Sequence, residues 1–181
     1  MIETLTQFES QPEGNNDPWP ALEGLFQHES EVAWQRVEHY TAWRFVPRNV
    51  CWLLDSQGGE WHPPLRPYRD LTARRWTGDG YETVQLARAP GGWRIPAGRY
   101  EISAVVGDGI APAIVCRAVQ RLAEYLRDAG QQPAGVRSYS INAGQLSESL
   151  TLHPNAEARA MQASGAADLL RGFRRVSHGL D

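Results

Sequence analysis

Hydrophobic residues recur at helical spacing in two long segments of the chain. The first runs from about residue 18 or 20 to about residue 42, and its apolar side carries Leu22, Leu25, Phe26, Ala33, Val37 and Tyr40. The second runs from about residue 111 to about residue 129, with a continuous apolar stripe, Pro112 in the first turn and Gly130 after the last. We therefore predict two amphipathic helices, of which the second has the stronger pattern.

Between these helices, over residues 45–106, the pattern changes to the alternation that is typical of β-strands. The turn Thr77–Gly80 separates two strand-like runs and is a good hairpin signal. The predicted strands are Val50–Leu54, Leu71–Trp76, Tyr81–Leu86 and Arg99–Val106. We expect a small antiparallel sheet inserted between the helices, so that residues 18–130 form one core.

The regions outside this core have a different composition. Residues 1–17 are polar and turn-rich, which predicts a flexible lead-in, and residues 131–153 are rich in Gln, Gly and Ser, which predicts an extended loop. Residues 154–181 begin with a helical segment that runs to about Leu170. The predicted fold class is α+β: a small helical bundle with an inserted antiparallel sheet and an extended C-terminal helical tail.

The C-terminal tail alternates apolar side chains with guanidinium groups. Its apolar residues are Leu169, Leu170 and Phe173, and its basic residues are Arg171, Arg174 and Arg175. So short a segment cannot bury its own apolar face. It is expected either to pack back onto its own domain or to dock into a partner, where the arginines would pair with carboxylates or phosphates.

Charge is distributed unevenly along the chain. Residues 1–38 carry eight acids against one Arg, a net −7, whereas residues 39–99 carry nine Arg against five acids, a net +4. The whole chain has a net charge of −3, which argues against binding nucleic acid through an overall positive field. All 18 basic residues are Arg, so lysine nucleophiles and Schiff bases are excluded.

No residue pattern indicates catalysis, a cofactor or a metal. The five histidines lie outside ligand-like clusters, and neither Gly-Asp-Gly turn continues into a phosphate-binding loop. Cys51 and Cys116 lie in apolar runs and are expected to be small buried residues. No signal peptide or membrane-spanning run is recognisable, so we expect a soluble, non-enzymatic protein made in a reducing cytoplasm.

The order of these parts resembles a known family. A long helix closes on Val37–Arg44, a Trp-bearing strand ends at Asp55, Pro63–Leu65 precedes a hairpin, and Gly107–Pro112 opens a hydrophobic helix that is followed by the Arg-rich tail. Over roughly residues 18–176 the chain resembles the head–tail connector, or adaptor, proteins of long-tailed bacteriophages and gene transfer agents.

This resemblance implies a structural virion protein. Such connectors form a ring, typically of twelve copies, under the portal of the capsid. The ring extends the DNA channel, through which genomic DNA passes without sequence specificity, and presents a platform for the next neck or tail protein. The implied location is the virion neck, reached after assembly in the host cytoplasm, with no membrane partner.

The resemblance also suggests contact residues. In the family the C-terminal segment engages the portal, which corresponds here to Leu169, Leu170, Arg171, Phe173, Arg174 and Arg175. The charge split suggests that the acidic region of one subunit meets the basic region of the next. The residues proposed for that contact are Glu23, Glu31, Glu38, Arg69, Arg74 and Arg75.

Two other functions stay open from the sequence. One is a stopper or tail-completion protein of the same neck, although such proteins are mostly built of β-structure. The other is a carbohydrate- or ligand-binding module that stacks its ligand on exposed Trp61, Trp76 or Trp93. An enzyme is the weakest candidate.

Overall fold

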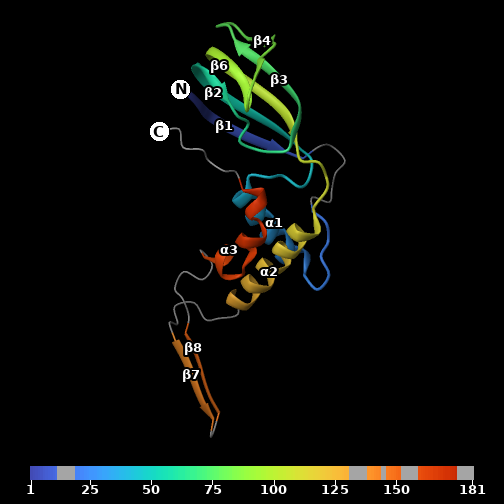
Figure 1. The fold of residues 1–181 in the computed structure, drawn as a ribbon, viewed down its shortest axis with the longest axis vertical. Helices are drawn as coiled ribbons and strands as arrows, with labels where there is room; N and C mark the ends of the chain where they lie inside the picture. The colour runs from blue at the N-terminus through green and yellow to red at the C-terminus, as the bar shows by residue number, and fades with distance from the viewer. Residues whose placement is uncertain (12–18, 131–137, 144–145, 152–158, 175–181) are drawn as a thin grey trace. The chain divides into compact units, whose positions relative to one another are not determined.

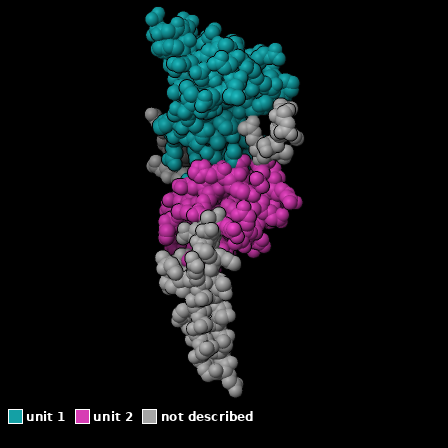
Figure 2. Space-filling view, turned by 90° about the vertical axis from the view of Figure 1, so that its left-hand side faces the viewer, with its two compact units in different colours: residues 1–20, 42–110 teal, residues 21–41, 111–181 magenta. Residues whose placement is uncertain are grey.

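A computed structural model describes residues 1–11, 19–130, 138–143, 146–151 and 159–174 (Figure 1). The chain forms two compact units, coloured separately in Figure 2. Unit 1 consists of residues 1–20 and 42–110, and unit 2 consists of residues 21–41 and 111–181. The α+β class is confirmed, but the predicted single core over residues 18–130 is divided between the two units.

Unit 1 is built around an antiparallel sheet with the strand order β1-β2-β6-β3-β4, and β5 pairs with β6. The predicted hairpin is confirmed, because β3 and β4 flank the turn after Trp76 and pair from Ala73↔Val84 to Trp76↔Tyr81. The strands are β1 (Ile2–Ser10), β2 (Arg48–Trp61), β3 (Tyr68–Trp76), β4 (Tyr81–Val84), β5 (Ala87–Ala89) and β6 (Gly92–Val106).

The two longest strands, β2 and β6, enclose the core of unit 1. They pair from Arg48↔Val106 to Trp61↔Trp93, far beyond the predicted Val50–Leu54 strand. Trp52 and Trp61 are nine residues apart, about 30 Å in an extended strand, yet their rings meet edge to face with centroids 5.4 Å apart. Strand β2 is therefore strongly bent, and Gly58 and Gly59, with φ of 94° and 151°, lie within the bend.

The prediction of a flexible lead-in is wrong for residues 2–10. They form β1, an edge strand that pairs with β2 from Ile2↔Ser56 to Ser10↔Asn49, with a register shift between Thr4 and Thr6 (Figure 1). The strand lacks the apolar alternation of a half-buried strand, and most of its side chains are exposed. Polar contacts, described below, fix it to the sheet.

Unit 2 contains the helices α1 (Gln27–Thr41) and α2 (Ala113–Gly130), which pack against each other. Helix α2 agrees with the prediction, but α1 is shorter at its start. Gly24 has a φ of 78° and the Leu25 N–H bonds back to the Leu22 carbonyl, so a turn replaces the predicted first helical residues. The fully or nearly fully buried apolar residues of the pair are Ala33, Trp34, Val37, Val115, Ala118, Val119, Leu122 and Ala123.

The C-terminal half of unit 2 differs from the prediction at two places. Residues predicted as an extended loop include the antiparallel hairpin β7 (Ser138–Ala143) and β8 (Leu146–Thr151). The predicted final helix is interrupted at Gly165, whose φ is 72°, and so divides into α3 (Ala160–Ala163), α4 (Ala166–Leu169) and the 3-10 turn η1 (Arg171–Phe173).

Candidate assembly surfaces

The C-terminal segment packs onto its own unit. Helices α3 and α4 both contact α2, and the small residues Ala160 and Ala166, both fully buried, allow close approach. Leu170 is also fully buried. The turn at Gly165 makes this packing possible, because it folds α4 back and brings Gly165 close to the Arg121 guanidinium.

This packing leaves the residues proposed for portal contact unequally accessible. Leu170 has no exposed surface, so its proposed role in filling a portal pocket has to be corrected: it fills the core of its own unit. Leu169 and Phe173 are half-buried, and Arg171 is exposed. The Arg174 guanidinium lies over the Tyr40 ring, 4.9 Å from its centroid, and Arg175 lies outside the described residues.

The acidic residues proposed for subunit contact are not equally accessible. Glu23 is exposed and Glu31 is half-buried, with its carboxylate accepting a hydrogen bond from Gln27 at 3.0 Å. Glu38 is only 2% exposed. It lies on the buried side of α1 beside Val37, so its proposed contact with a neighbouring subunit has to be corrected.

The proposed basic residues lie on β3 and are exposed, but each has a partner within unit 1. Arg69 lies 3.6 Å from the Asp70 carboxylate. Arg74 pairs with Glu101 at 3.0 Å, and Arg75 donates to the Ala97 carbonyl at 3.1 Å. Their charges are therefore partly compensated before any subunit contact.

A cluster that the sequence did not reveal holds β1 in place. The Glu9 carboxylate accepts two hydrogen bonds from Arg44, at 2.7 and 2.8 Å, and lies 3.5 Å from Arg48. Two residue pairs along the strand, the Trp52 indole N–H donates to the Gln7 side-chain oxygen at 3.0 Å. Glu9 and Gln7 lie two residues apart on β1 and so share one side of the strand, the side on which they meet Arg44 and Trp52.

The charge environment of Glu9 makes this cluster sensitive to acid. Burial raises the pKa of Glu9, but the hydrogen bonds and charge of Arg44, the charge of Arg48 and a hydrogen bond from Gln7 outweigh it. The pKa therefore lies below its ordinary value of 4.5. The Glu9 carboxylate and the Arg44 guanidinium thus form strong, charge-assisted hydrogen bonds, which we call the Glu9 clamp.

We expect the contribution of Glu9 to stability to be present above the unfolded pKa near 4.5 and to be lost as the pH falls through the lowered folded pKa. Urea unfolding of the wild type and of Glu9→Gln, from about pH 6 to about pH 3, measures it. The difference between the two free energies of unfolding should shrink towards the acid end. A difference that stays constant across this range would contradict the assignment.

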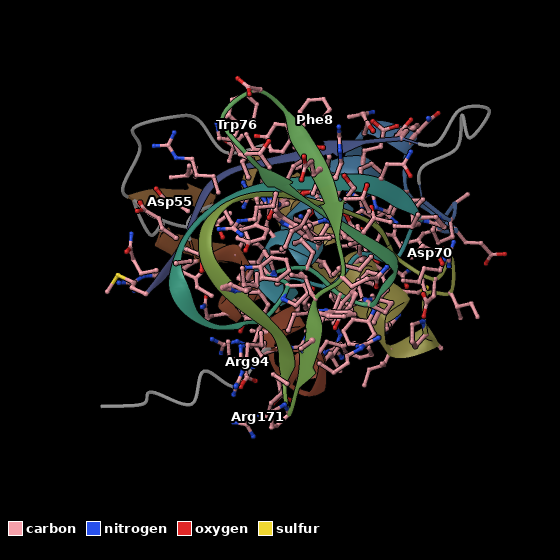
Figure 3. All side chains as sticks on the ribbon, turned by 90° about the horizontal axis from the view of Figure 1, so that it is seen from above. Phe8, Asp55, Asp70, Trp76, Arg94 and Arg171 are labelled. Atoms are coloured by element: carbon pink, nitrogen blue, oxygen red, sulfur yellow. The ribbon has the colours of Figure 1, made fainter. Side chains whose placement is uncertain are left out.

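The three tryptophans considered for ligand stacking are in unequal environments. Trp61 is 5% exposed and belongs to the core, and the Arg88 guanidinium lies 3.9 Å from the centroid of the Trp93 ring. Trp76 is 41% exposed, contacts Tyr81 edge to face and points outward from its strand, as Phe8 does from β1 (Figure 3). Trp76 is thus the one of the three with a substantial free surface.

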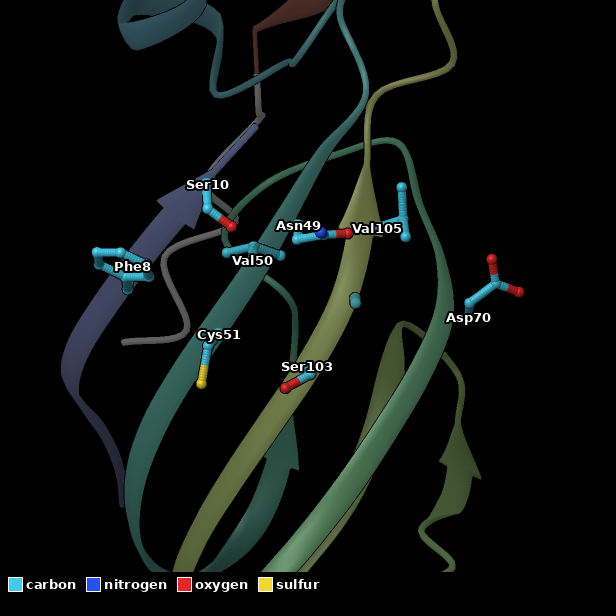
Figure 4. Close-up of a pocket in the computed structure, with 9 residues that line it drawn as sticks. Phe8, Ser10, Asn49, Val50, Cys51, Asp70, Ser103 and Val105 are labelled. Atoms are coloured by element: carbon cyan, nitrogen blue, oxygen red, sulfur yellow. The ribbon is translucent and has the colours of Figure 1, made fainter. Parts of the chain in front are cut away.

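A concave pocket lies on the outer face of the sheet of unit 1, the face opposite the core (Figure 4). Strands β1, β2 and β6 present Phe8, Cys51 and Ser103 side by side, because Phe8 is the partner of Cys51 and Cys51 is the partner of Ser103. The remaining lining residues are Ser10, Asn49, Val50, Asp70, Ala104 and Val105. The pocket has a volume of about 260 Å³.

Among the described residues, neither a metal-ligand cluster nor a reactive thiol is found. No group of three or more His, Cys, Asp or Glu in this part of the chain is placed to hold a metal ion. Burial raises the pKa of the Cys51 thiol and of the Cys116 thiol, so neither has the character of a reactive thiolate. No helix among the described residues is long and apolar enough to cross a membrane.

Comparison with known proteins gives a likeness of fold. No protein-family model and no curated protein matches the sequence. A chain from the virion of a native gene transfer agent particle matches 99% of this chain and 98% of its own length, with a TM-score of 0.53 and 19% identity. A chain from the neck of an empty gene transfer agent particle, computed with C6 symmetry, matches 100% of both chains with a TM-score of 0.52 and 18% identity.

Proposed function

We propose that this chain is a structural protein of the virion neck, a head–tail connector that forms a ring beneath the portal. The ring would extend the DNA channel and offer a platform to the next neck or tail protein. The observation that carries the proposal is the likeness of fold to chains of a gene transfer agent virion and neck, which spans both proteins almost completely. Because the match covers nearly the whole of both chains, it indicates a shared architecture.

Ring formation is supported by the surface of the described residues. Several large apolar side chains are exposed in both units, among them Phe8 at 66%, Phe26 at 68% and Ile114 at 46%. Apolar groups that a folded monomer leaves in water are characteristic of surfaces that a partner covers. A related neck has been computed with C6 symmetry, and rings of six or of twelve copies are both compatible with that symmetry.

Portal binding remains assigned to the end of the described chain, without Leu170. Phe173 and Arg171 would contribute apolar surface and charge, since Phe173 is half-buried and Arg171 is exposed. Arg174 is free to leave the Tyr40 ring, because cation–π contacts at exposed sites are weak.

We expect the double variant Phe173→Asp, Arg171→Glu to lose capture by the portal protein by at least about tenfold in Kd while keeping its fold, because it loses an apolar contact and reverses a charge. Surface-immobilised portal and circular dichroism give the two readouts. The matched control is Leu5→Asp, which places the same charge on an apolar side chain of unit 1 that is 52% exposed and lies outside the pocket lining. If the double variant binds the portal like the wild type, the segment is not the portal contact.

The stopper or tail-completion alternative is tested by the choice of partner. The sheet of unit 1 is the feature that the chain shares with such β-rich neck proteins. Binding to the tail-proximal neck protein in the absence of the portal, and no binding to the portal itself, would favour this alternative over the connector.

A further inference from the structure

The outer face of the sheet in unit 1 has apolar side chains at its centre and ion-paired side chains at its sides. Phe8 is 66% exposed, and Cys51 and Val105 are half-buried beside it. At the sides, Arg74 pairs with Glu101 at 3.0 Å and Arg99 lies 3.8 Å from Asp55. A face with an apolar centre and internally satisfied charges loses little by being covered, because no ion has to be stripped of water without a partner.

The pocket in this face suits one inserted side chain. Its volume of about 260 Å³ lies below the roughly 300–1,000 Å³ of small-molecule sites. Its lining is mostly apolar, and among the nine described lining residues only Asp70 carries a charge. Asp70 is exposed, with 76% of its side-chain surface accessible.

A ring of identical subunits needs two different complementary patches on each chain. In such a head-to-tail contact a concave patch on one copy meets a convex patch on the next, and the rotation closes. The pocket supplies the concave patch in unit 1. The convex patch must therefore come from another exposed apolar side chain of the same sequence.

Three large apolar side chains among the described residues of unit 2 are exposed, Phe26, Val32 and Ile114, and charge distinguishes them. Val32 directly follows Glu31 on α1 and lies three residues after Glu29, so its surroundings are acidic. Phe26 lies at the start of α1 close to Glu29, whose carboxylate accepts a hydrogen bond from the Phe26 N–H.

Ile114, in the first turn of α2, has Arg117 three residues and Arg121 seven residues further on the same side of the helix. Both arginines are exposed. Asp70 is the only charged residue in the described pocket lining, and although Arg69 lies 3.6 Å from its carboxylate, 76% of its side-chain surface stays accessible, so it favours the patch that carries the arginines.

We propose that the outer-face pocket of one subunit receives Ile114 of a second copy of this chain, with Arg117 of that copy beside Asp70. This inference rests on the proposed ring and identifies the contact that would close it. One carboxylate on the pocket rim then faces one guanidinium on helix α2 of the second copy.

The pocket itself provides the reporter, because Cys51 lies in its lining. In a Cys116→Ala background, a maleimide probe should label Cys51 at least about tenfold more slowly in the assembled ring than in the monomer. Ser103→Trp should fill the pocket and prevent ring formation. Its matched control, Gln57→Trp, introduces the same indole at an exposed position of β2 outside the pocket lining and should assemble normally.

The proposed contact between Arg117 and Asp70 is tested by reversing one charge and then removing the other. Arg117→Glu places a carboxylate beside Asp70 and should weaken assembly by at least about tenfold, and adding Asp70→Asn should restore most of the loss. Asn suits this position because residue 70 has a φ of 54°, which Asn tolerates.

The outcomes separate the two proposals. Slow labelling in the ring, failure of Ser103→Trp and relief by Asp70→Asn would support the pocket contact. A ring that labels at the monomer rate and tolerates Ser103→Trp would overturn the pocket contact and leave the connector function standing. A chain that forms no ring, alone or on the portal, would overturn both.

Discussion

Replacing Glu9 with Gln should lower the free energy of unfolding by about 3 kcal/mol, at the lower end of what breaking a buried ion pair costs. The substitution removes the negative charge that Arg44 contacts at 2.7 and 2.8 Å, and the Arg44 side chain is only 4% exposed. The buried Arg44 guanidinium would then lack the carboxylate that accepts two of its hydrogen bonds. Urea unfolding followed by tryptophan fluorescence measures the loss, with Trp52 as a nearby reporter.

The matched control for this experiment is Glu3→Gln. It makes the same chemical change on the same strand, but Glu3 is exposed. Such a surface substitution should alter stability by no more than about 0.5 kcal/mol. Equal effects of the two substitutions would show that the Glu9 clamp does not hold β1.

Replacing Leu170 with Ala should destabilise the protein by about 3 kcal/mol, within the range for deleting a fully buried leucine side chain. Leu170 is completely buried at the end of α4, which packs against α2. The removed carbons leave a cavity that the neighbouring helix cannot close without moving. Thermal or urea unfolding measures the change.

Leu169→Ala is the control, because it deletes the same atoms one residue earlier. Leu169 is half-buried, so less apolar surface returns to water and less cavity forms. Its effect should be less than half that of Leu170→Ala. A larger effect at residue 169 would mean that Leu169, and not Leu170, anchors the segment.

The elements that the sequence predicted correctly carry strong local signals. Helix α2 has an uninterrupted apolar stripe and Pro112 just before its first residue, and the hairpin β3–β4 has its turn at Thr77–Gly80. Both depend on neighbours along the chain, so their pattern is legible without knowledge of the fold.

Strand β1 was missed because its stabilising partners are far away in the sequence. Glu9 bonds to Arg44, 35 residues on, and Gln7 to Trp52, 45 residues on. A strand held by such polar pairs shows no period-two apolar pattern. A run of alternating polar side chains at the start of the chain, Gln7 and Glu9 among them, was the available signal.

The residues proposed for subunit and portal contact also depend on the tertiary fold, which the sequence pattern alone does not give. The charge distribution along the sequence suggested Glu38 for a subunit contact, but the structure buries it. The apolar pattern of the tail correctly marked Leu170 as a residue that needs cover, and could not decide whether its own unit or a partner supplies it. The outer-face pocket has no sequence signature, because Phe8, Cys51 and Ser103 meet only through strand pairing.

The most direct test of the connector proposal is native mass spectrometry of the purified chain, alone and mixed with the portal protein of the same particle. The account predicts a closed ring of uniform copy number, formed by the chain alone or on the portal, and negative-stain images of that sample should show an annulus with an open centre. A chain that stays monomeric and does not bind the portal would contradict it.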